Sequence, residues 1–236
     1  MRIIILTTET PHHLYFIKKI SAFFPINGIA VESRILKPDF PTQHSFESAR
    51  DRYEIQELLG GRKVRFDDYS ETRVFHNIND DASIDFVSGL NPDVIVTYGT
   101  GLIKKPMIRL CPEGIINLHG GDPEHYRGLD THLWAIYHRD FDQLIVTLHR
   151  LNPKLDDGEI ISKAKIQLKR TSEISKLRAE NTKLCVKSAL SALSGFKQLG
   201  SFISWPQRGK GRYYSFMPAP LKDICVRNFT NHLRQL

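Results

Sequence analysis

The chain has 236 residues, 41% of them hydrophobic and 25% charged, which is typical of a soluble globular protein with one large domain, or one domain and an appendage. Its longest apolar runs are too short to span a bilayer and Met1–Leu6 lacks a signal-peptide pattern, so we expect a cytoplasmic protein with no membrane partner. The net charge is +7, and residues 163–236 hold 15 of the 33 Lys and Arg but only 3 of the 26 Asp and Glu. This asymmetry leaves open a polyanionic or phosphate-bearing partner and an ordinary solvated basic face.

The first residues alternate strand and helix signals. An Ile-rich run over Arg2–Leu6 predicts a buried strand, and Thr7–Pro11 carries turn and helix-start chemistry. Apolar residues at helical spacing predict a helix over His12–Phe24, and Gly28–Glu32 predicts a second strand. This strand-helix-strand opening predicts a parallel sheet and an α/β fold.

Residues 33–80 are polar with weak periodicity, and one helix is predicted there, from Ser45 to Leu59. The remaining elements are predicted as helices over Ala82–Leu90, Lys105–Leu110 and Thr131–Arg139, and strands over Pro92–Tyr98, Ile115–His119, Leu144–His149 and Glu159–Leu168. A long amphipathic helix is expected over Glu173–Leu199, capped by Ser172 and closed by Gly200. We expect a catalytic core over residues 1–170, with a C-terminal helix and basic tail over residues 171–236 packed on it. The apolar face of that helix packs on the core or on a second copy in a homodimer, and the sequence leaves both open.

The motif Asn117-Leu118-His119 lies at the end of a predicted strand. Side chains alternate along a strand, so Asn117 and His119 are expected to point to the same side. An amide donor beside an imidazole can stabilise an oxyanion and move a proton, and a carboxylate such as Asp156 can fix the tautomer of the imidazole. Residue types alone leave a structural role as open as a catalytic one.

Metal and dinucleotide sites are not indicated by the sequence. Cys111, Cys185 and Cys225 are isolated, which indicates buried apolar packing and a reducing compartment. Five histidines show no metal spacing and are assigned no role: His44, His76, His138, His149 and His232. The segment Tyr98–Ile103 lacks the G-x-G-x-x-G pattern, which argues against NAD. We therefore expect no metal.

The sequence around these residues resembles that of the folate-dependent formyltransferase family, which includes the glycinamide ribonucleotide and methionyl-tRNA enzymes. The resemblance rests on Gly114–His119, Tyr126–Gly128, Trp134–Ile136 and Leu155–Ile161, and is strongest over residues 92–162. It implies a Rossmann-like formyltransferase core, with a mostly parallel sheet flanked by helices and a short C-terminal helical or extended extension. It also implies N10-formyltetrahydrofolate as co-substrate.

The same resemblance implies roles for individual residues. Asn117, His119 and Asp156 align with the catalytic residues, whereas Asp157 departs from the family pattern and competes with Asp156 for its role. The residues implied in folate binding are Tyr98, Gly99, Gly101, Leu102, Ile103 and Asp156. The glycines of this set would let a flat heterocycle approach the main chain. The alternative for the segment Tyr98–Ile103 is an ordinary strand-to-helix turn.

The loop after the histidine departs from the purine and tRNA enzymes. Where those carry Pro-Ser-Leu-Leu-Pro, this chain has Gly120–His125, which is similar to N-formyltransferases acting on nucleotide-linked amino sugars for surface polysaccharide. The implied acceptor is an amino dideoxy sugar of the GDP-perosamine or dTDP-4-amino-4,6-dideoxyglucose type. Candidate acceptor-binding residues are Thr8, Glu9, Thr10, His12, Gly120, Gly121, Asp122, Tyr126, Arg127, Arg212 and Tyr213. Ordinary helix capping at Thr7–His13 and a basic surface turn at Gln207–Tyr214 are the alternatives.

Three other functions stay open at this point. A formyltetrahydrofolate hydrolase uses the same three residues with water as the acceptor, and a formyltransferase of the same family acts on another small amine. A non-catalytic nucleotide- or RNA-binding protein is the alternative from another class. No arginine-rich run or aromatic-basic motif indicates nucleic acid, so a nucleic-acid partner is not expected.

Overall fold

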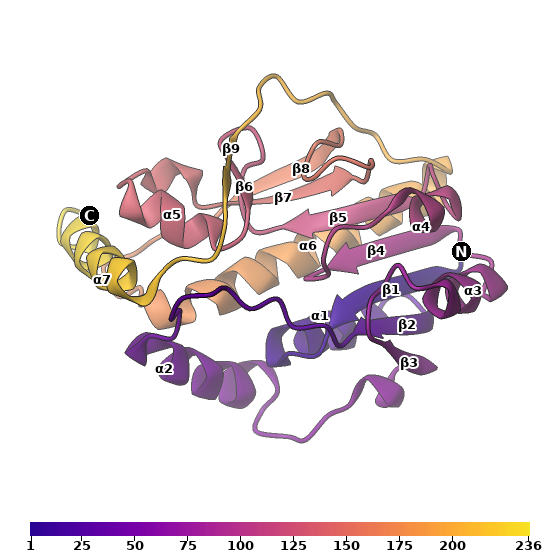
Figure 1. The fold of residues 1–236 in the computed structure, drawn as a ribbon, viewed down its shortest axis with the longest axis horizontal. Helices are drawn as coiled ribbons and strands as arrows, with labels where there is room; N and C mark the ends of the chain where they lie inside the picture. The colour runs from indigo at the N-terminus through magenta and orange to yellow at the C-terminus, as the bar shows by residue number, and fades with distance from the viewer.

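The computed structural model describes all 236 residues and has a seven-stranded sheet at its centre (Figure 1). The strand order is β3-β2-β1-β4-β5-β7-β8. The parallel strands are β3 (Thr72–Phe75), β2 (Ile26–Glu32), β1 (Ile3–Thr8), β4 (Val94–Tyr98) and β5 (Ile115–His119). Two antiparallel strands, β7 (Ile145–Arg150) and β8 (Ile160–Lys165), complete the sheet. The predicted α/β class with a mostly parallel sheet is therefore confirmed.

Helices cover both faces of the sheet, and the alternating side chains of the strands fill two separate cores. In β1, Ile3 and Ile5 pack toward α1 (Pro11–Ser21) and α6 (Leu177–Leu199). Ile4 and Leu6 pack toward α3 (Asp81–Gly89) and α4 (Lys105–Arg109) on the opposite face. All four side chains are fully buried, and each such burial contributes roughly 1.5–3 kcal/mol to folding. Burial on both faces explains why this strand is a continuous apolar run.

A third hydrophobic cluster lies between α5 (Thr131–Tyr137) and α7 (Ala219–Leu233). A two-stranded parallel sheet of β6 (Tyr126–Gly128) and β9 (Arg212–Tyr214) lies beside it. The extension after the long helix contains β9 and α7, two elements that the sequence analysis does not predict individually. Four residues of α7 recur every fourth position and pack as one face: Leu221, Cys225, Phe229 and Leu233.

The ends of the helices follow local chemistry at two of three predicted positions. Thr10 caps α1, its hydroxyl accepting from the His13 N–H at 3.3 Å. Gly200 closes α6 with a left-handed φ of 74°. The prediction of Ser172 as the cap of the long helix is wrong: its hydroxyl accepts from the Lys169 N–H, and a 3₁₀ turn over Ile174–Lys176 precedes α6.

Residues 33–80, for which the sequence predicts only a helix, also contribute the edge strand β3. The helix α2 (Ser45–Tyr53) continues into one π-helical turn over Glu54–Leu58 before the chain turns at two glycines. That turn places Glu54 inside the protein with no exposed surface. Two further 3₁₀ turns lie at Phe66–Asp68 and Phe141–Gln143.

Several other expectations concern the whole molecule. The three cysteines are unbonded and buried, as predicted. None of the helices combines the length and the apolar character that crossing a bilayer requires. No group of His, Cys, Asp and Glu side chains is arranged to hold a metal ion. The domain boundary at residue 170 stays a prediction; α6 shares its core with the sheet, whereas α7 packs in the third cluster.

The two glycines of α6 predict opposite effects of alanine on stability. A Cβ at Gly195, inside the helix, meets no atom within 4 Å, so Gly195→Ala should raise the free energy of unfolding by about 0.5–1 kcal/mol through helix propensity. Gly200→Ala should lower it by about 1–2 kcal/mol, because alanine resists the left-handed conformation. Urea denaturation measures both, and a destabilised Gly195→Ala variant would contradict the packing around α6.

Candidate active site

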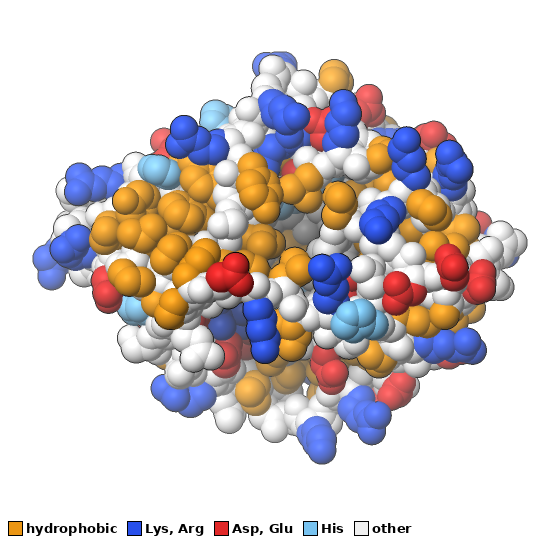
Figure 2. Space-filling view, viewed as in Figure 1, with side chains coloured by type: hydrophobic (Ala, Val, Ile, Leu, Met, Phe, Trp, Pro, Cys, Tyr) orange, Lys and Arg blue, Asp and Glu red, His pale blue; other side chains and the backbone are white.

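One cavity of about 750 Å³ opens at the carboxyl ends of β4 and β5, and Figure 2 shows the molecular face hollowed near its centre. Its walls come from the loops after these strands, from the loop between β7 and β8, and from α1, α2, α5 and α6. Ligands of open α/β sheets bind outside the carboxyl ends of the strands, close to where the strand order reverses. Here that reversal lies between β1 and β4. Asn117, His119 and Asp156 all line this cavity.

Asn117 is held in one orientation by its neighbours. The Thr97 hydroxyl donates to its Oδ1 at 2.7 Å. Its Nδ2 lies 3.1 Å from Nε2 of His149, the residue directly opposite on β7. Because His149 Nδ1 lies 2.8 Å from the Arg150 carbonyl oxygen, that nitrogen carries the proton and Nε2 accepts. One N–H of the Asn117 amide is thereby used, and the other is free for the cavity.

His119 takes its tautomer from the main chain. Its Nε2 lies 3.0 Å from the Tyr126 carbonyl oxygen, which can only accept, so Nε2 carries a proton. Its Nδ1 lies 3.8 Å from Asp156 Oδ1, which is ion-pair distance and longer than a hydrogen bond. The expectation that Asp156 fixes the tautomer is therefore wrong: Tyr126 fixes it, and Asp156 contributes negative charge beside the ring.

Asp156 lies between two imidazoles. Its Oδ1 is 3.8 Å from His119 Nδ1 and 3.7 Å from His149 Nε2, and its Oδ2 accepts from the Gly128 N–H at 3.0 Å. Burial would raise the pKa of this carboxyl, but the charge of His119 and the Gly128 amide outweigh it and hold the pKa well below its ordinary value. The carboxylate is therefore charged throughout the physiological range.

The loop that carries Asp156 is clamped from two sides. The residue has a left-handed φ of 47°, unusual for a side chain other than glycine. Arg127 and Gln207 both donate to its carbonyl oxygen, at 2.6 and 2.9 Å. Arg127 also binds Asp157 at 2.9 Å, and Asp157 neither touches His119 nor lines the cavity. Geometry thus favours Asp156 over Asp157, and Arg127, a predicted acceptor-binding residue, instead supports this loop.

The segment Tyr98–Ile103 lines the cavity along its whole length. The side chain of Glu32, which is buried, accepts from the Gly101 N–H at 2.7 Å, so that N–H is not available to a ligand. A Cβ at Gly99 would overlap the His13 ring. Both glycines thus allow close packing inside the protein, and the role predicted for them in folate binding stays a prediction. The N–H groups of Leu102 and Ile103 have no protein acceptor and stay free.

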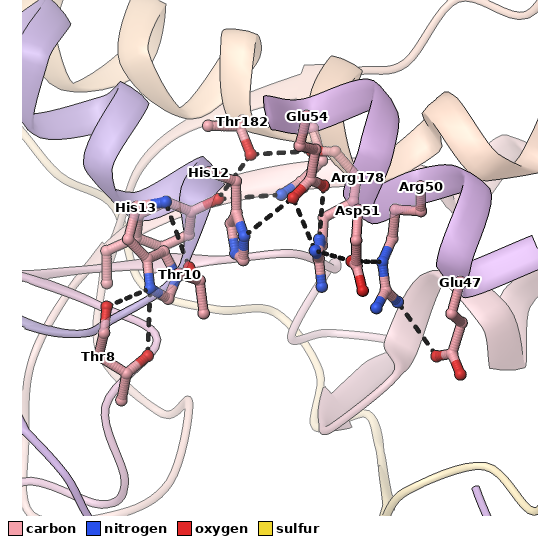
Figure 3. Close-up of polar contacts among 12 residues, drawn as sticks. Thr8, Thr10, His12, His13, Glu47, Arg50, Asp51, Glu54, Arg178 and Thr182 are labelled. Carbon is pink, nitrogen blue, oxygen red and sulfur yellow. Dashed lines mark hydrogen bonds and ion pairs between the residues drawn. The ribbon is translucent and has the colours of Figure 1, made fainter. Parts of the chain in front are cut away.

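The predicted anion-binding residues after β1 lie outside this cavity: Thr8, Glu9 and Thr10 do not line it. The hydroxyl of Thr8 contacts His13 Nδ1 and the Gly99 carbonyl, and Thr10 caps α1 (Figure 3). His12 lines the cavity but turns Nδ1 toward Glu54 Oε2 at 3.6 Å. Burial, with Arg178 and Arg50 nearby, holds the pKa of His12 well below its ordinary value, so the ring is neutral.

Some of the other predicted acceptor-binding residues line the cavity, and the rest pack behind its wall. Gly120 and Tyr213 line the cavity, whereas Gly121, Asp122, Tyr126 and Arg212 do not. A Cβ at Gly121 would press on His119 Nε2 and the Thr131 hydroxyl. Asp122 is buried and paired with Lys163 at 2.6 Å. The Tyr126 hydroxyl donates to Asp140. The loop after His119 thus packs the site from behind.

Sequence reasoning misses four supporting residues: Glu32, Thr97, His149 and Gln207. His149 has no metal spacing, and its role comes from the antiparallel register that sets it opposite Asn117. Gln207 lies in a segment that looks like a basic surface turn, yet it binds the carbonyl oxygens of Asp156 and Gly158. His149 could have been identified only by pairing β5 with β7 in the antiparallel register that places it opposite Asn117.

Comparison with known proteins gives one family match. The model described as formyl transferase matches residues 43–193, which is more than half of the chain. The matched region contains Asn117, His119 and Asp156. It begins before the region in which the sequence motifs are strongest.

Solved structures share the fold at low sequence identity. HypX from Aquifex aeolicus in complex with tetrahydrofolic acid is 18% identical with a TM-score of 0.60, covering 94% of this chain and 31% of HypX. The chain thus spans about a third of the length of HypX. PseJ from Anoxybacillus kamchatkensis, in complex with UDP-4,6-dideoxy-4-formamido-L-AltNAc and tetrahydrofolate, is 19% identical with a TM-score of 0.53, covering 91% and 86%. A sugar N-formyltransferase from a Shewanella species is 12% identical with a TM-score of 0.59, covering 97% and 87%.

The lowered pKa of Asp156 predicts an acid-sensitive contribution to stability. A depressed folded-state pKa stabilises the protein above the unfolded-state value of about 3.9, and this contribution is lost as the pH falls below it. The difference in unfolding free energy between wild type and Asp156→Asn should therefore shrink from about pH 6 to about pH 3. Urea titrations at several pH values measure it, and parallel pH profiles for the two proteins would contradict the prediction.

The loop around Asp156 also predicts an intolerant glycine. A Cβ at Gly158 would overlap the main-chain oxygen of Arg150, which is part of β7. Gly158→Ala should therefore cost about 1–3 kcal/mol of stability and displace Asp156. Gly209→Ala is the matched control, because its Cβ meets only the Glu124 oxygen at an ordinary 3.8 Å. Equal unfolding midpoints for the two variants would show that the loop is not rigid.

Proposed function

Since the chain belongs to the formyl transferase family, we propose that it transfers a formyl group from N10-formyltetrahydrofolate to a primary amine of a nucleotide-linked amino sugar. The observation that carries the proposal is the convergence of an oriented amide, an imidazole and a buried carboxylate in one cavity: Asn117, His119 and Asp156. Acyl transfer requires such groups, because negative charge develops on the carbonyl oxygen during attack. A formylated dideoxy sugar for lipopolysaccharide or O-antigen synthesis is the product class we propose.

The proposed reaction begins with a neutral amine attacking the formyl carbon. The free N–H of Asn117 donates to the formyl oxygen as charge develops there, and its orientation is already set by Thr97 and His149. Such preorganised donors are worth about 3 kcal/mol of barrier each. His119, positively charged when Nδ1 is protonated beside Asp156, adds to this stabilisation.

Proton transfer completes the proposed step. Attack leaves a positively charged nitrogen on the acceptor, and the folate nitrogen must gain a proton as its bond to the formyl carbon breaks. His119 first gives its Nδ1 proton to the folate nitrogen and then takes a proton from the acceptor nitrogen at the same Nδ1, since Nε2 keeps its proton on the Tyr126 carbonyl. Asp156 favours the charged imidazole during this transfer without moving a proton itself.

The folate is proposed to lie between the loop after β4 and the loop that carries Asp156. The unpaired N–H groups of Leu102 and Ile103 are available to acceptor atoms of a flat heterocycle. The side chains of Leu102 and Leu155 are 48% and 39% exposed and line the same cavity, so apolar surface flanks this space. Tetrahydrofolate in the similar HypX and PseJ structures supports the proposal.

Two observations support the proposed acceptor class, a nucleotide-linked amino sugar. PseJ, whose fold this chain shares, holds a UDP-linked formamido sugar. Tyr213, 59% exposed at the cavity wall, presents an aromatic surface on which a nucleobase can stack.

The proposal is tested by incubating the protein with N10-formyltetrahydrofolate and a panel of nucleotide-linked amino sugars. A mass gain of one formyl group on one sugar is the expected result. Release of formate with every sugar unchanged would identify a hydrolase instead. Unconsumed formyl-folate in all mixtures would refute the proposal.

Asn117→Ala should lower turnover roughly 10²–10³-fold while the protein folds normally, because a single oxyanion donor is lost. Asn231→Ala, at an exposed position on α7, serves as the matched control and should keep wild-type turnover. Steady-state kinetics with circular dichroism provide the measurement. Wild-type turnover in a well-folded Asn117→Ala protein would remove Asn117 from the mechanism.

A further inference from the structure

Three cationic side chains line the cavity, and two of them lie together between α2 and α6. These two are Arg50 and Arg178, whereas the third, Lys154, lies on the loop before Asp156 and is 77% exposed. Figure 3 shows both arginines beside the carboxylates of Glu47, Asp51 and Glu54. None of those carboxylates lines the cavity. The cavity therefore meets the guanidinium groups, and the negative charges lie behind them.

Arg178 is held by carboxylates through two of its guanidinium nitrogens, and the third nitrogen has no partner. Its Nε and Nη2 bind the two oxygens of Glu54 at 2.6 Å each, and Nη2 also binds Asp51 at 3.0 Å. Glu54 has no exposed surface, so this bidentate pair is anchored inside the protein. Nη1 has no protein partner, and 29% of the side chain is exposed. A buried carboxylate thus fixes a guanidinium group that lines the cavity and has one unpaired nitrogen.

Arg50 repeats this arrangement from the other side. Its Nε binds Asp51 at 3.0 Å, its Nη1 binds Glu47 at 3.1 Å, and Nη2 has no protein partner. Lys222 in turn binds Glu47 at 3.0 Å. Asp51 contacts both guanidinium groups, which brings the two arginines into one unit. The free nitrogens of two preorganised guanidinium groups are the donors that oxyanions prefer.

Asn181 relates this unit to the reacting centre. It lies three residues after Arg178 on α6, so the two side chains share a face about 5–6 Å apart. A chain of hydrogen bonds fixes its amide: Thr182 donates to the Arg178 carbonyl, Tyr98 contacts Thr182, and Asn181 Nδ2 donates to Tyr98. Its Oδ1 has no partner, although the residue is only 7% exposed, and it points toward Gly120, the residue after His119.

We propose, building on the proposed function, that Arg50 and Arg178 bind an anionic group of the acceptor, either a phosphate or a carboxylate. The group lies about one helical turn of α6 from the end of β5, where the amine reacts. The unpartnered Asn181 oxygen marks the intervening wall as a place for an N–H or O–H donor of the same molecule. A sugar with phosphate on one side of its ring and an amine on the other meets both requirements. This moves the anion site from Thr8–Thr10, which lie outside the cavity, to α2 and α6.

The test measures anion binding directly, with inorganic pyrophosphate and malonate as probes of phosphate and carboxylate recognition. Calorimetric titrations compare wild type with Arg50→Gln, and the tighter probe identifies the group that the site takes. Arg50→Gln should weaken that probe about tenfold or more, because one charge-assisted donor is lost. Arg52→Gln, on the same helix, exposed and outside the cavity, is the matched control and should bind as wild type does.

The second variant avoids leaving Glu54 unpaired inside the protein. Glu54→Gln with Arg178→Gln removes both charges of the buried pair together, and its thermal midpoint shows whether it folds. A folded double variant should lose anion affinity as Arg50→Gln does. Equal anion affinity in wild type and Arg50→Gln, or no binding of either probe to wild type, would overturn the proposal. A separate titration with 5-formyltetrahydrofolate tests the proposed function by itself, so that the failure of one is distinguishable from the failure of the other.

Discussion

The site depends on one buried carboxylate that is kept charged. Asp156 is 6% exposed, and an isolated carboxylate at that depth would take up a proton. The imidazole of His119 at 3.8 Å and one main-chain N–H at 3.0 Å prevent this. The arrangement requires a left-handed backbone at Asp156, and it exists because Arg127 and Gln207 hold the carbonyl oxygen of the same residue.

Most of the conspicuous polar residues near the cavity orient others and do not face a ligand. Glu32 holds the loop after β4, Thr97 sets the amide of Asn117, and Tyr126 sets the tautomer of His119. Such supports fix reacting groups before substrate arrives, which is how an active site avoids reorganisation during the reaction. The tail takes part in this too, since β9 pairs with β6, and β6 contributes both the Tyr126 carbonyl and the Gly128 amide.

Two sides of the cavity present different chemical groups. The loop after β4 and the loop of Asp156 present apolar side chains and free main-chain N–H groups, as at Leu102. The face between α2 and α6 presents guanidinium groups backed by carboxylates. A flat heterocycle suits the former and an anion suits the latter, and Asn117 and His119 belong to the same cavity wall.

The sequence by itself determined the α/β class, most helices and strands, and the shared face of Asn117 and His119, because these depend on local periodicity of two or 3.6 residues. It also supplied the motifs that carry the family resemblance. Only the tertiary structure decided that His149 stands opposite Asn117, that Gln207 reaches the Asp156 loop, and that Thr8, Glu9 and Thr10 stay out of the cavity. These facts depend on strand register and on contacts between residues tens of positions apart, which no local pattern along the chain contains.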